Sequence, residues 1–345
     1  MVISLGNPGG QRSPGPRVLL YGAGSIGGVY VYQLLQAGCE VTAVCRSNYS
    51  TVKAHGFNLK SLRYGNVCYR PTHVVRDLTE CANQCFDYVL VCTKALPDSK
   101  PSLAQQIEPV LQGRPRTVII LAQNGIMIEE DVAVAFPQNP VLSGVVYCPA
   151  VQTGPGTIVY PEMLNCLELG TYPATAPSSH KMAAKKFVDL MINGGGGAEL
   201  HENIQIARWS KLLMNAAWNP IGALTLTTDG DFLLTSDPYA HESILGIMKE
   251  IVELAEVMGV PGVSMEVAEK KFSIARKRAE TGTGREMSML QDVRQGRPFE
   301  VEAIVGNAVR LGREKSVSMP RLETLYALAK GRCWALMQEQ TRKPS

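Results

Sequence analysis

The sequence has no long apolar run and no strong excess of charge of either sign. Its 345 residues include 34 Lys and Arg and 31 Asp and Glu, and only 6% are aromatic. No apolar stretch reaches the roughly 20 residues that a membrane-spanning helix needs, which excludes a spanning protein. The charges are interspersed and form no basic stripe, so we expect neither a nucleic-acid partner nor a membrane partner.

Cysteine pairs with metal-binding spacing are also missing. The nine cysteines form no C-x-x-C pair and have no histidine at zinc-finger spacing. Several lie in apolar segments, among them Cys45, Cys92 and Cys148, where a thiol acts as a small core residue. We therefore predict no metal site and a reducing compartment, with the cytoplasm as the simplest location.

The length and composition are typical of a globular protein with two domains. The chain is 45% hydrophobic, and beyond Glu202 short strand patterns give way to long helical ones. We expect a disordered arm over 1–16, a first domain over 17–200 and a helical domain over 201–345. The arm is rich in Gly and Pro and lacks the apolar core of a secretory signal, and an organelle-targeting sequence is the alternative reading.

A strand, a glycine-rich turn and a helix are predicted between Arg17 and Gly38. Gly22, Gly24 and Gly27 have the spacing G-x-G-x-x-G, in which the glycines allow a sharp turn, a close pyrophosphate and close helix contact. A helix N-terminus adds free N–H groups for an anion. A tight turn without a ligand is the alternative. We predict that a dinucleotide contacts the six turn residues Gly22, Ala23, Gly24, Ser25, Ile26 and Gly27.

The residue after the next strand indicates which dinucleotide fits. This strand is predicted over Glu40 to Cys45, and Arg46 follows it. NAD sites place an acid near this strand end, whereas a cation suits the 2′-phosphate of NADP. No Asp or Glu occurs between Val41 and Lys60. The sequence therefore predicts NADP, and a solvent-exposed arginine is the alternative.

Two further apolar strands end in polar residues. Lys94 follows the strand predicted over 87–93, and Asn124 follows the strand predicted over 117–122. Ligands of open α/β sheets lie beyond the carboxyl ends of the strands, so we expect both side chains to face the cofactor. We also predict edge strands or a hairpin near 58–69, and strands over 141–152 and 156–169 that extend the sheet.

One polar stripe lies on an apolar helix predicted over 207–225. Lys211, Asn215 and Asn219 are spaced four apart and so share one helical face, and Pro220 is expected to kink or end the helix. A buried ammonium group costs several kcal/mol unless it is paired, which favours a partner acid or a solvent-filled cleft. A lysine that snorkels to the helix edge is the alternative.

The segment 284–306 combines polar residues with a helix-turn-helix pattern. Ser288 lies in the first helix, and Glu300 starts an otherwise apolar second helix. Acids are favoured in a first helical turn, so a purely structural role for Glu300 is equally compatible with its position.

In this order, the motifs resemble the ketopantoate reductase (2-dehydropantoate 2-reductase) family. The glycine loop, Arg46, the lysine in LVCTKA and the Asn124-Gly125 pair with Glu129 are followed by K-x-x-x-N-x-x-x-N-P, which begins at Lys211. S-M-L-Q-D then covers 288–292, and Gly296, Arg297 and Glu300 complete the match. The resemblance covers nearly the whole chain beyond residue 16.

The resemblance implies an α/β fold, with a Rossmann-type doubly wound domain and an all-helical domain like the C-terminal part of 6-phosphogluconate dehydrogenase. It implies an active site in the cleft between the domains, where NADPH reduces a 2-oxo acid, most specifically ketopantoate to pantoate. By this resemblance Lys211 is the general acid and Glu300 orients the substrate. The remaining implied contacts are Asn215, Asn219 and Ser288 with the substrate, and Lys94 and Asn124 with the cofactor.

Two positions depart from the family pattern. Asp229 and Arg285 stand where the family often has asparagine, and both would touch the substrate. A guanidinium at 285 could clamp a carboxylate, and Asp229 would repel one unless it pairs with that arginine. A same-fold reductase for a different ketone or imine, and an NADPH sensor without turnover, are therefore the alternative functions. The small 2-oxo acid is the expected partner, and a homodimer is left open.

Overall fold

The structure, a computed structural model, describes residues 15–342. The expected N-terminal arm over 1–16 therefore lies almost wholly outside the described residues. The chain divides into two compact units. Unit 1 comprises the chain up to Lys94, Ser99–Gln123 and Glu129–Ile204, and unit 2 comprises Ala95–Asp98, Asn124–Ile128 and the chain from Gln205.

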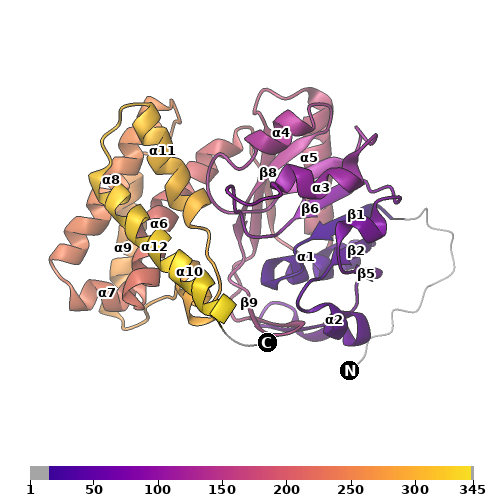
Figure 1. Cartoon of the computed structure of the whole chain (residues 1–345), viewed down its shortest axis with the longest axis horizontal. Helices are drawn as coiled ribbons and strands as arrows, with labels where there is room; N and C mark the ends of the chain where they lie inside the picture. Colours follow the sequence, from indigo (N-terminus) through magenta and orange to yellow (C-terminus); the bar gives the residue numbers. More distant parts are fainter. Residues whose placement is uncertain (1–14, 343–345) are drawn as a thin grey trace. The chain divides into compact units, whose positions relative to one another are not determined.

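Unit 1 is built on an eight-stranded sheet with the order β12-β11-β8-β7-β6-β1-β2-β5 (Figure 1). The strands are β1 (Arg17–Tyr21), β2 (Glu40–Val44), β5 (His73–Val75), β6 (Tyr88–Val91), β7 (Val118–Leu121), β8 (Val141–Tyr147), β11 (Cys166–Tyr172) and β12 (Ala198–Leu200). Neighbouring strands pair in parallel except β8 with β11. β6 and β7 are buried along their whole length, as parallel strands between two helical layers are.

Helices cover both faces of this sheet. α1 (Ser25–Gln36) joins β1 to β2, and α3 (Leu103–Leu111) follows β6 and leads to β7 on the other side of β1. The connection from β1 to β2 and the connection from β6 to β7 run toward opposite edges of the sheet. Because both crossovers are right-handed, their helices lie on opposite faces of the sheet. The predicted doubly wound α/β fold is confirmed. The other helices of unit 1 are α2 (Tyr49–His55), the 3₁₀-helix η1 (Leu78–Cys81), α4 (Glu130–Ala135) and α5 (Ser178–Asn193).

A second, four-stranded sheet was not expected. Its order is β4-β3-β10-β9, formed by β3 (Phe57–Ser61), β4 (Gly65–Tyr69), β9 (Val151–Gly154) and β10 (Thr157–Tyr160). The predicted hairpin is β3 with β4, but the prediction that the whole of 141–152 and 156–169 extends the main sheet is wrong for β9 and β10. Alternation identifies a strand without identifying its partner. The side chains of Ile158 in β10 and Phe57 in β3 both lie against the bare backbone of Gly28 in α1, a contact between segments that are distant in the sequence.

Unit 2 is helical over its described residues from Gln205 onward. Its elements are α6 (Ile204–Thr225), α7 (Asp229–Thr235), α8 (Tyr239–Val257), α9 (Met265–Glu280), α10 (Ser288–Arg294), the π-helix η2 (Glu302–Gly306), α11 (Asn307–Glu314) and α12 (Pro320–Arg342). Trp218 stacks on Phe272 in its core, with ring centroids 6.3 Å apart. The expectation that α6 could end at Pro220 is wrong, because the helix continues to Thr225. The proline removes one backbone donor, and the apolar contacts of α6 continue beyond it at Ile221 and Ala223.

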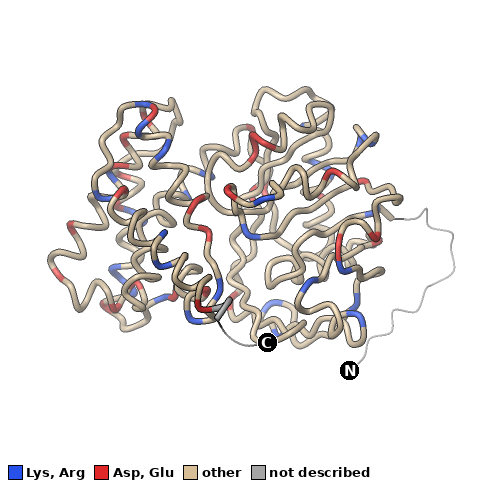
Figure 2. Tube along the Cα trace, in the orientation of Figure 1, with Lys and Arg blue, Asp and Glu red and all other residues tan. Residues whose placement is uncertain are grey.

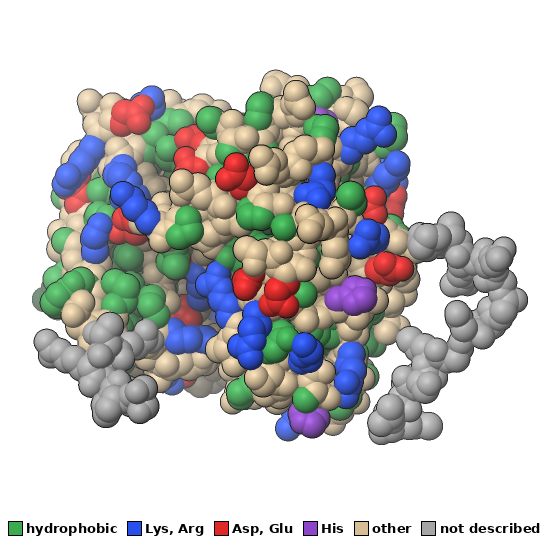
Figure 3. Space-filling view, turned by 45° about the vertical axis from the view of Figure 1, so that its right-hand side comes forward, with side chains coloured by type: hydrophobic (Ala, Val, Ile, Leu, Met, Phe, Trp, Pro, Cys, Tyr) green, Lys and Arg blue, Asp and Glu red, His purple; other side chains and the backbone are tan. Residues whose placement is uncertain are grey.

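Charged side chains of both signs are distributed through both units. Figure 2 shows Lys and Arg mixed with Asp and Glu along the trace. The face drawn in Figure 3 carries basic and acidic side chains with hydrophobic side chains between them. Among the residues described, no helix is both long enough and apolar enough to cross a bilayer.

Candidate active site

The glycine turn of unit 1 leaves an open approach to the backbone. Gly22 has a φ of +105°, and a Cβ there would lie 2.5 Å from a backbone nitrogen beyond β6. A Cβ on Gly27 would lie 2.2 Å from the carbonyl oxygen of Gly22. At both positions the backbone passes too close for any side chain, so only glycine fits. Gly24 differs, because its Cβ would meet nothing within 4 Å. The Asn48 amide donates to the carbonyl oxygen of Ala23 at 2.8 Å and fixes the turn.

Gly24 is the N-cap of α1, and the helix proper begins at Ser25 and Ile26. Within the described part of the chain no side chain caps this end, and the first turn of the helix contains no acidic residue. The first N–H groups of a helix have no partner within the helix, and its positive dipole end favours an anion. The predicted turn therefore has the form of a phosphate cradle.

Arg46 lies at the carboxyl end of β2, where the cofactor prediction requires a cation. Its side chain is exposed and donates to the hydroxyl of Tyr21. The guanidinium lies 5.4 Å from the centroid of the Tyr21 ring and 3.5 Å from Gln106 Oε1. Lys94, also exposed, follows β6. The contacts of Arg46 hold a positive charge in place while leaving it accessible to a ligand.

A chain of hydrogen bonds in unit 2 joins the predicted general acid to the predicted carboxylate. Lys211 is half-buried on α6, and its Nζ donates to Asn124 Oδ1 at 3.0 Å. Asn124 Nδ2 in turn donates to Glu300 Oε2 at 3.1 Å. The backbone N–H of Ala95 donates to Glu300 Oε1 at 2.8 Å, and Glu300 is only 5% exposed. The structure thus brings together Lys211, Asn124 and Glu300.

The segment that carries Asn124 is anchored to the helices of unit 2. Arg208 donates to the carbonyl oxygen of Gly125, and Asn307 donates to that of Ile126, each at 2.7 Å. Gly125 has a φ of +93°, and a Cβ there would lie 2.3 Å from the carbonyl oxygen of Ala303. Sequence reasoning missed Arg208 and Asn307. The available signal was a second cation three residues before Lys211, on the same face of an apolar helix.

Glu300 immediately precedes a helical stretch that contains a π-helix, whereas the sequence suggested that it starts the helix. Within the π-helix, Glu302 accepts hydrogen bonds from Arg310 at 2.7 Å and from Tyr326 at 2.8 Å, and its carboxylate lies 2.8 Å from Lys330. Burial opposes its ionisation, but the hydrogen bonds from Lys330, Arg310 and Tyr326 outweigh burial and lower the pKa of Glu302. π-helices are rare in proteins, and those that occur are often found at functional sites.

Asn219 and Ser288, predicted from separate motifs, are hydrogen-bonded to each other. Asn219 is 2% exposed, and its Oδ1 accepts from Ser288 Oγ at 2.9 Å and from the Met289 N–H at 3.2 Å. Asn219 therefore holds the start of α10. Asn215 is half-buried one turn earlier on α6, between Lys211 and Asn219.

Asp229 is an internal carboxylate with a partner that the sequence did not indicate. Its side chain is fully buried and accepts two hydrogen bonds from the guanidinium of Arg278. Arg285 contributes its backbone N–H, which donates to Asp229 Oδ1 at 2.6 Å. The cation that pairs with Asp229 is thus Arg278, whereas Arg285 contacts Asp229 through its backbone. The reason is that α9 and α7 pack together, a contact that local spacing does not reveal.

Comparison with protein-family models gives two matches. The family described as ketopantoate reductase PanE/ApbA matches residues 18–173, and its C-terminal part matches residues 203–332. An uncharacterized protein of Saccharomyces cerevisiae is 30% identical over 342 residues, which cover 90% of this chain and 92% of that protein.

Solved structures show the same architecture. The 2-dehydropantoate 2-reductase of Methylococcus capsulatus is 35% identical, with a TM-score of 0.77 over 95% of this chain and 98% of its own. A D-mandelate dehydrogenase, solved with NADH and anilino(oxo)acetate, has a TM-score of 0.79 at 23% identity over 93% of this chain and 99% of its own. The second likeness shows the fold alone.

Proposed function

Because this chain belongs to the ketopantoate reductase family, a family of oxidoreductases, we propose that it uses NADPH to reduce a 2-oxo acid. The leading substrate is 2-dehydropantoate, with pantoate as the product. The observation that carries the proposal is the hydrogen-bonded series Lys211, Asn124 and Glu300. A ketone reductase needs a proton donor that is held in one orientation, and these contacts would hold Lys211 in that way.

The residues of unit 1 fit a dinucleotide with a 2′-phosphate. The open space at Gly24 and the uncapped N-terminus of α1 suit the pyrophosphate, and the exposed guanidinium of Arg46 suits the 2′-phosphate. When bound, the reduced nicotinamide supplies the hydride. The mandelate dehydrogenase of the same fold was solved with NADH, and Arg46 is our reason for preferring NADPH in this chain. Lys94 and Asn124 are proposed to contact the ribose and nicotinamide end.

Lys211 is proposed to donate a proton from Nζ to the alkoxide oxygen that forms at the substrate carbonyl. Asn124 directs the ammonium group through its Oδ1 and is itself held by Glu300. The ammonium charge also stabilises the alkoxide, which develops only as the reaction proceeds. Glu300 keeps both carboxylate oxygens engaged, one with Ala95 and one with Asn124, and is proposed to orient the substrate hydroxyl.

Asn215, Ser288 and Arg285 are the proposed substrate contacts. The guanidinium of Arg285 would receive the carboxylate of the 2-oxo acid. The hydroxyl of Ser288, which donates to Asn219 in this structure, would turn to donate to the same carboxylate. Asn219 and Asp229, also predicted to contact substrate, would act through neighbours: Asn219 holds Ser288, and Asp229 holds the backbone of Arg285.

Replacing the proposed acid provides the direct test. In Lys211→Met the side chain keeps its length and loses its proton, so we expect kcat to fall by about 10²- to 10⁴-fold. NADPH binding, measured by fluorescence titration, should change little. Unchanged turnover in Lys211→Met would remove Lys211 from the mechanism.

The cofactor preference has its own test. Arg46→Ala should raise the KM for NADPH by about 10-fold or more, because a charge-assisted contact to phosphate is lost, and should leave the KM for NADH nearly unchanged. Arg116→Ala is the matched control, an exposed arginine outside the proposed site. An equal rise in the KM for NADPH and for NADH in Arg46→Ala would contradict the assignment of Arg46 to the 2′-phosphate.

The second candidate is a reductase of the same fold that acts on a different ketone or imine. Arg285 and Asp229, which stand where the family often has asparagine, favour it. A panel of 2-oxo acids with bulkier groups separates the two candidates, because the preferred substrate has the highest kcat/KM. An NADPH sensor would oxidise none of them.

A further inference from the structure

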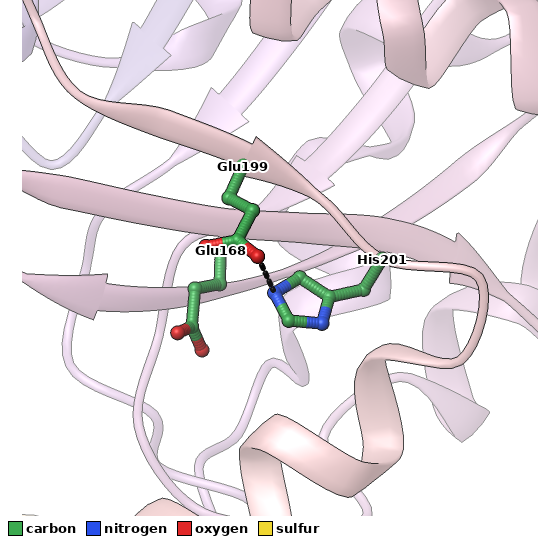
Figure 4. A group of neighbouring side chains, drawn as sticks. All are labelled: Glu168, Glu199 and His201. Atoms are coloured by element: carbon green, nitrogen blue, oxygen red, sulfur yellow. Dashed lines mark ion pairs between the residues drawn. The ribbon is translucent and has the colours of Figure 1, made fainter.

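A group of metal-ligating side chains lies in unit 1 at the β12 edge of the main sheet, apart from the proposed catalytic residues. Figure 4 shows Glu168, Glu199 and His201, whose ligand atoms all lie within 4.8 Å of one another. We propose that these three side chains bind one divalent transition-metal ion, with Zn²⁺ as the expected ion. This site is independent of the proposed reductase reaction, and it replaces the sequence-based expectation that the chain has no metal site.

Strand register explains why the three side chains converge. Glu168 on β11 pairs directly with Glu199 on β12 in parallel register, so their side chains point to the same face. His201 follows Glu199 by two residues, and its backbone N–H continues the ladder by donating to the carbonyl oxygen of Leu169 at 2.8 Å. Side chains two residues apart in a strand share a face. The backbone therefore places all three on one surface.

The electrostatics of this surface favour a cation. Two carboxylates directly opposite each other on neighbouring strands repel and destabilise the pair. A divalent ion between the carboxylates would convert the repulsion into attraction.

The imidazole supplies the observation that distinguishes this group from an ordinary acidic pair. His201 Nε2 is inaccessible to solvent and has no hydrogen-bond partner among the described residues. The nitrogen is directed at Glu199 Oε1 from 3.7 Å, beyond hydrogen-bonding distance (Figure 4). Unpaired buried polar atoms are costly, and a neutral imidazole nitrogen is a preferred zinc ligand.

The required adjustment is small. Zinc–ligand bonds of about 2.0 to 2.2 Å place tetrahedral ligand atoms roughly 3.3 to 3.6 Å apart. A spacing as wide as 4.8 Å must therefore contract by roughly 1.2 to 1.5 Å. The Glu199 side chain is 64% exposed and is free to rotate by that amount. One nitrogen and two carboxylate oxygens leave a fourth position for water. The ion would tie the three-residue edge strand β12 to β11, just before the chain passes into α6 and unit 2.

Metal titration of the full chain tests the proposal. Chelator-treated protein is titrated with Zn²⁺ by calorimetry and with Co²⁺ by absorption, and the midpoint of thermal unfolding is measured with and without Zn²⁺. We expect one ion per chain, a higher midpoint, and affinity at least 10-fold weaker in Glu199→Gln and in His201→Gln. The exposed residues Glu242 and His55 give the matched controls Glu242→Gln and His55→Gln, which should bind as the unmodified protein does.

The readouts also identify competing sites. A thiolate-to-Co²⁺ charge-transfer band, or equal affinity in Glu199→Gln and the controls, would assign binding to cysteines or to scattered surface groups and overturn the proposal. Absence of saturable binding to the unmodified protein would do the same. NADPH oxidation by Glu199→Gln should be unchanged, so failure of the metal site and failure of the reductase assignment are separable.

Discussion

Asp229 is an internal carboxylate whose charge is balanced by Arg278 from α9. The Asp229 side chain is fully buried, and that of Arg278 is 22% exposed. Arg278→Met would leave the carboxylate buried without its cation, so we expect the free energy of unfolding to fall by about 3 kcal/mol in urea titrations. The KM for the 2-oxo acid should also rise, because Asp229 holds the backbone of Arg285.

Arg276→Met provides the control for this prediction. Arg276 pairs with Glu280 one helical turn away on the same helix, and both side chains are about 60% exposed. Exposed pairs of this kind contribute roughly 0.5 kcal/mol or less. Equal effects of the two substitutions on stability would show that Arg278 acts only as a surface residue.

At the level of elements, the glycine turn and α1 allow two opposite substitutions. A Cβ at Gly24 meets no atom within 4 Å, so Gly24→Ala should fold with an unchanged thermal midpoint. It should nevertheless raise the Kd for NADPH by about 10-fold or more, because the methyl group would occupy the space proposed for the pyrophosphate.

Gly27→Ala should instead destabilise unit 1, since its Cβ would lie 2.2 Å from a backbone oxygen of the same turn. Calorimetry measures the thermal midpoint of both variants, and fluorescence titration measures their Kd for NADPH. Normal NADPH affinity in Gly24→Ala would contradict the phosphate cradle.

The π-helix η2 gives a prediction of pH dependence. The pKa of Glu302 is lowered from its ordinary value of 4.5 by hydrogen bonds from Lys330, Arg310 and Tyr326, despite its burial. A lowered pKa means that this carboxylate stabilises the fold above the ordinary value, and that the contribution is lost as the pH falls through the lowered one. Glu302→Gln should therefore be less stable than the unmodified protein at pH 7, by about 1.5 to 3 kcal/mol.

The difference between Glu302→Gln and the unmodified protein should shrink as the pH is lowered below 4.5. Urea titrations between neutral and acid pH measure it. A difference that is constant across this range would mean that Glu302 stabilises η2 by shape alone.

Element by element, the sequence predicted what depends on local pattern. Period-two alternation located β3 and β4, and the apolar runs located β1, β6 and β7. It could not assign β9 and β10 to the second sheet, because sheet membership depends on a contact with Gly28 that is distant in sequence. The sequence also left open whether Pro220 kinks or ends its helix, and α6 continues to Thr225, where tertiary contacts offset the lost backbone donor.

On the scale of the whole molecule, neither of the two units is formed by one continuous segment of the chain. Ala95–Asp98 and Asn124–Ile128 interrupt the first half of the chain but belong to unit 2. The sequence placed Asn124 at a strand end and Lys211 on a helix, yet spacing alone could not show that they are hydrogen-bonded. The family resemblance supplied the roles of these residues, and the structure supplied the contacts between them.

Lys211 is proposed to donate the proton in an NADPH-dependent reduction of a 2-oxo acid. The most direct measurement of this role is single-turnover oxidation of bound NADPH on mixing with 2-dehydropantoate, in the unmodified protein and in Lys211→Met. We predict rapid oxidation in the unmodified protein, and a rate about 10²- to 10⁴-fold lower in Lys211→Met at unchanged NADPH affinity. Equal rates in the two proteins would remove Lys211 from the reaction, and no oxidation with any 2-oxo acid would rule out the proposed reductase activity.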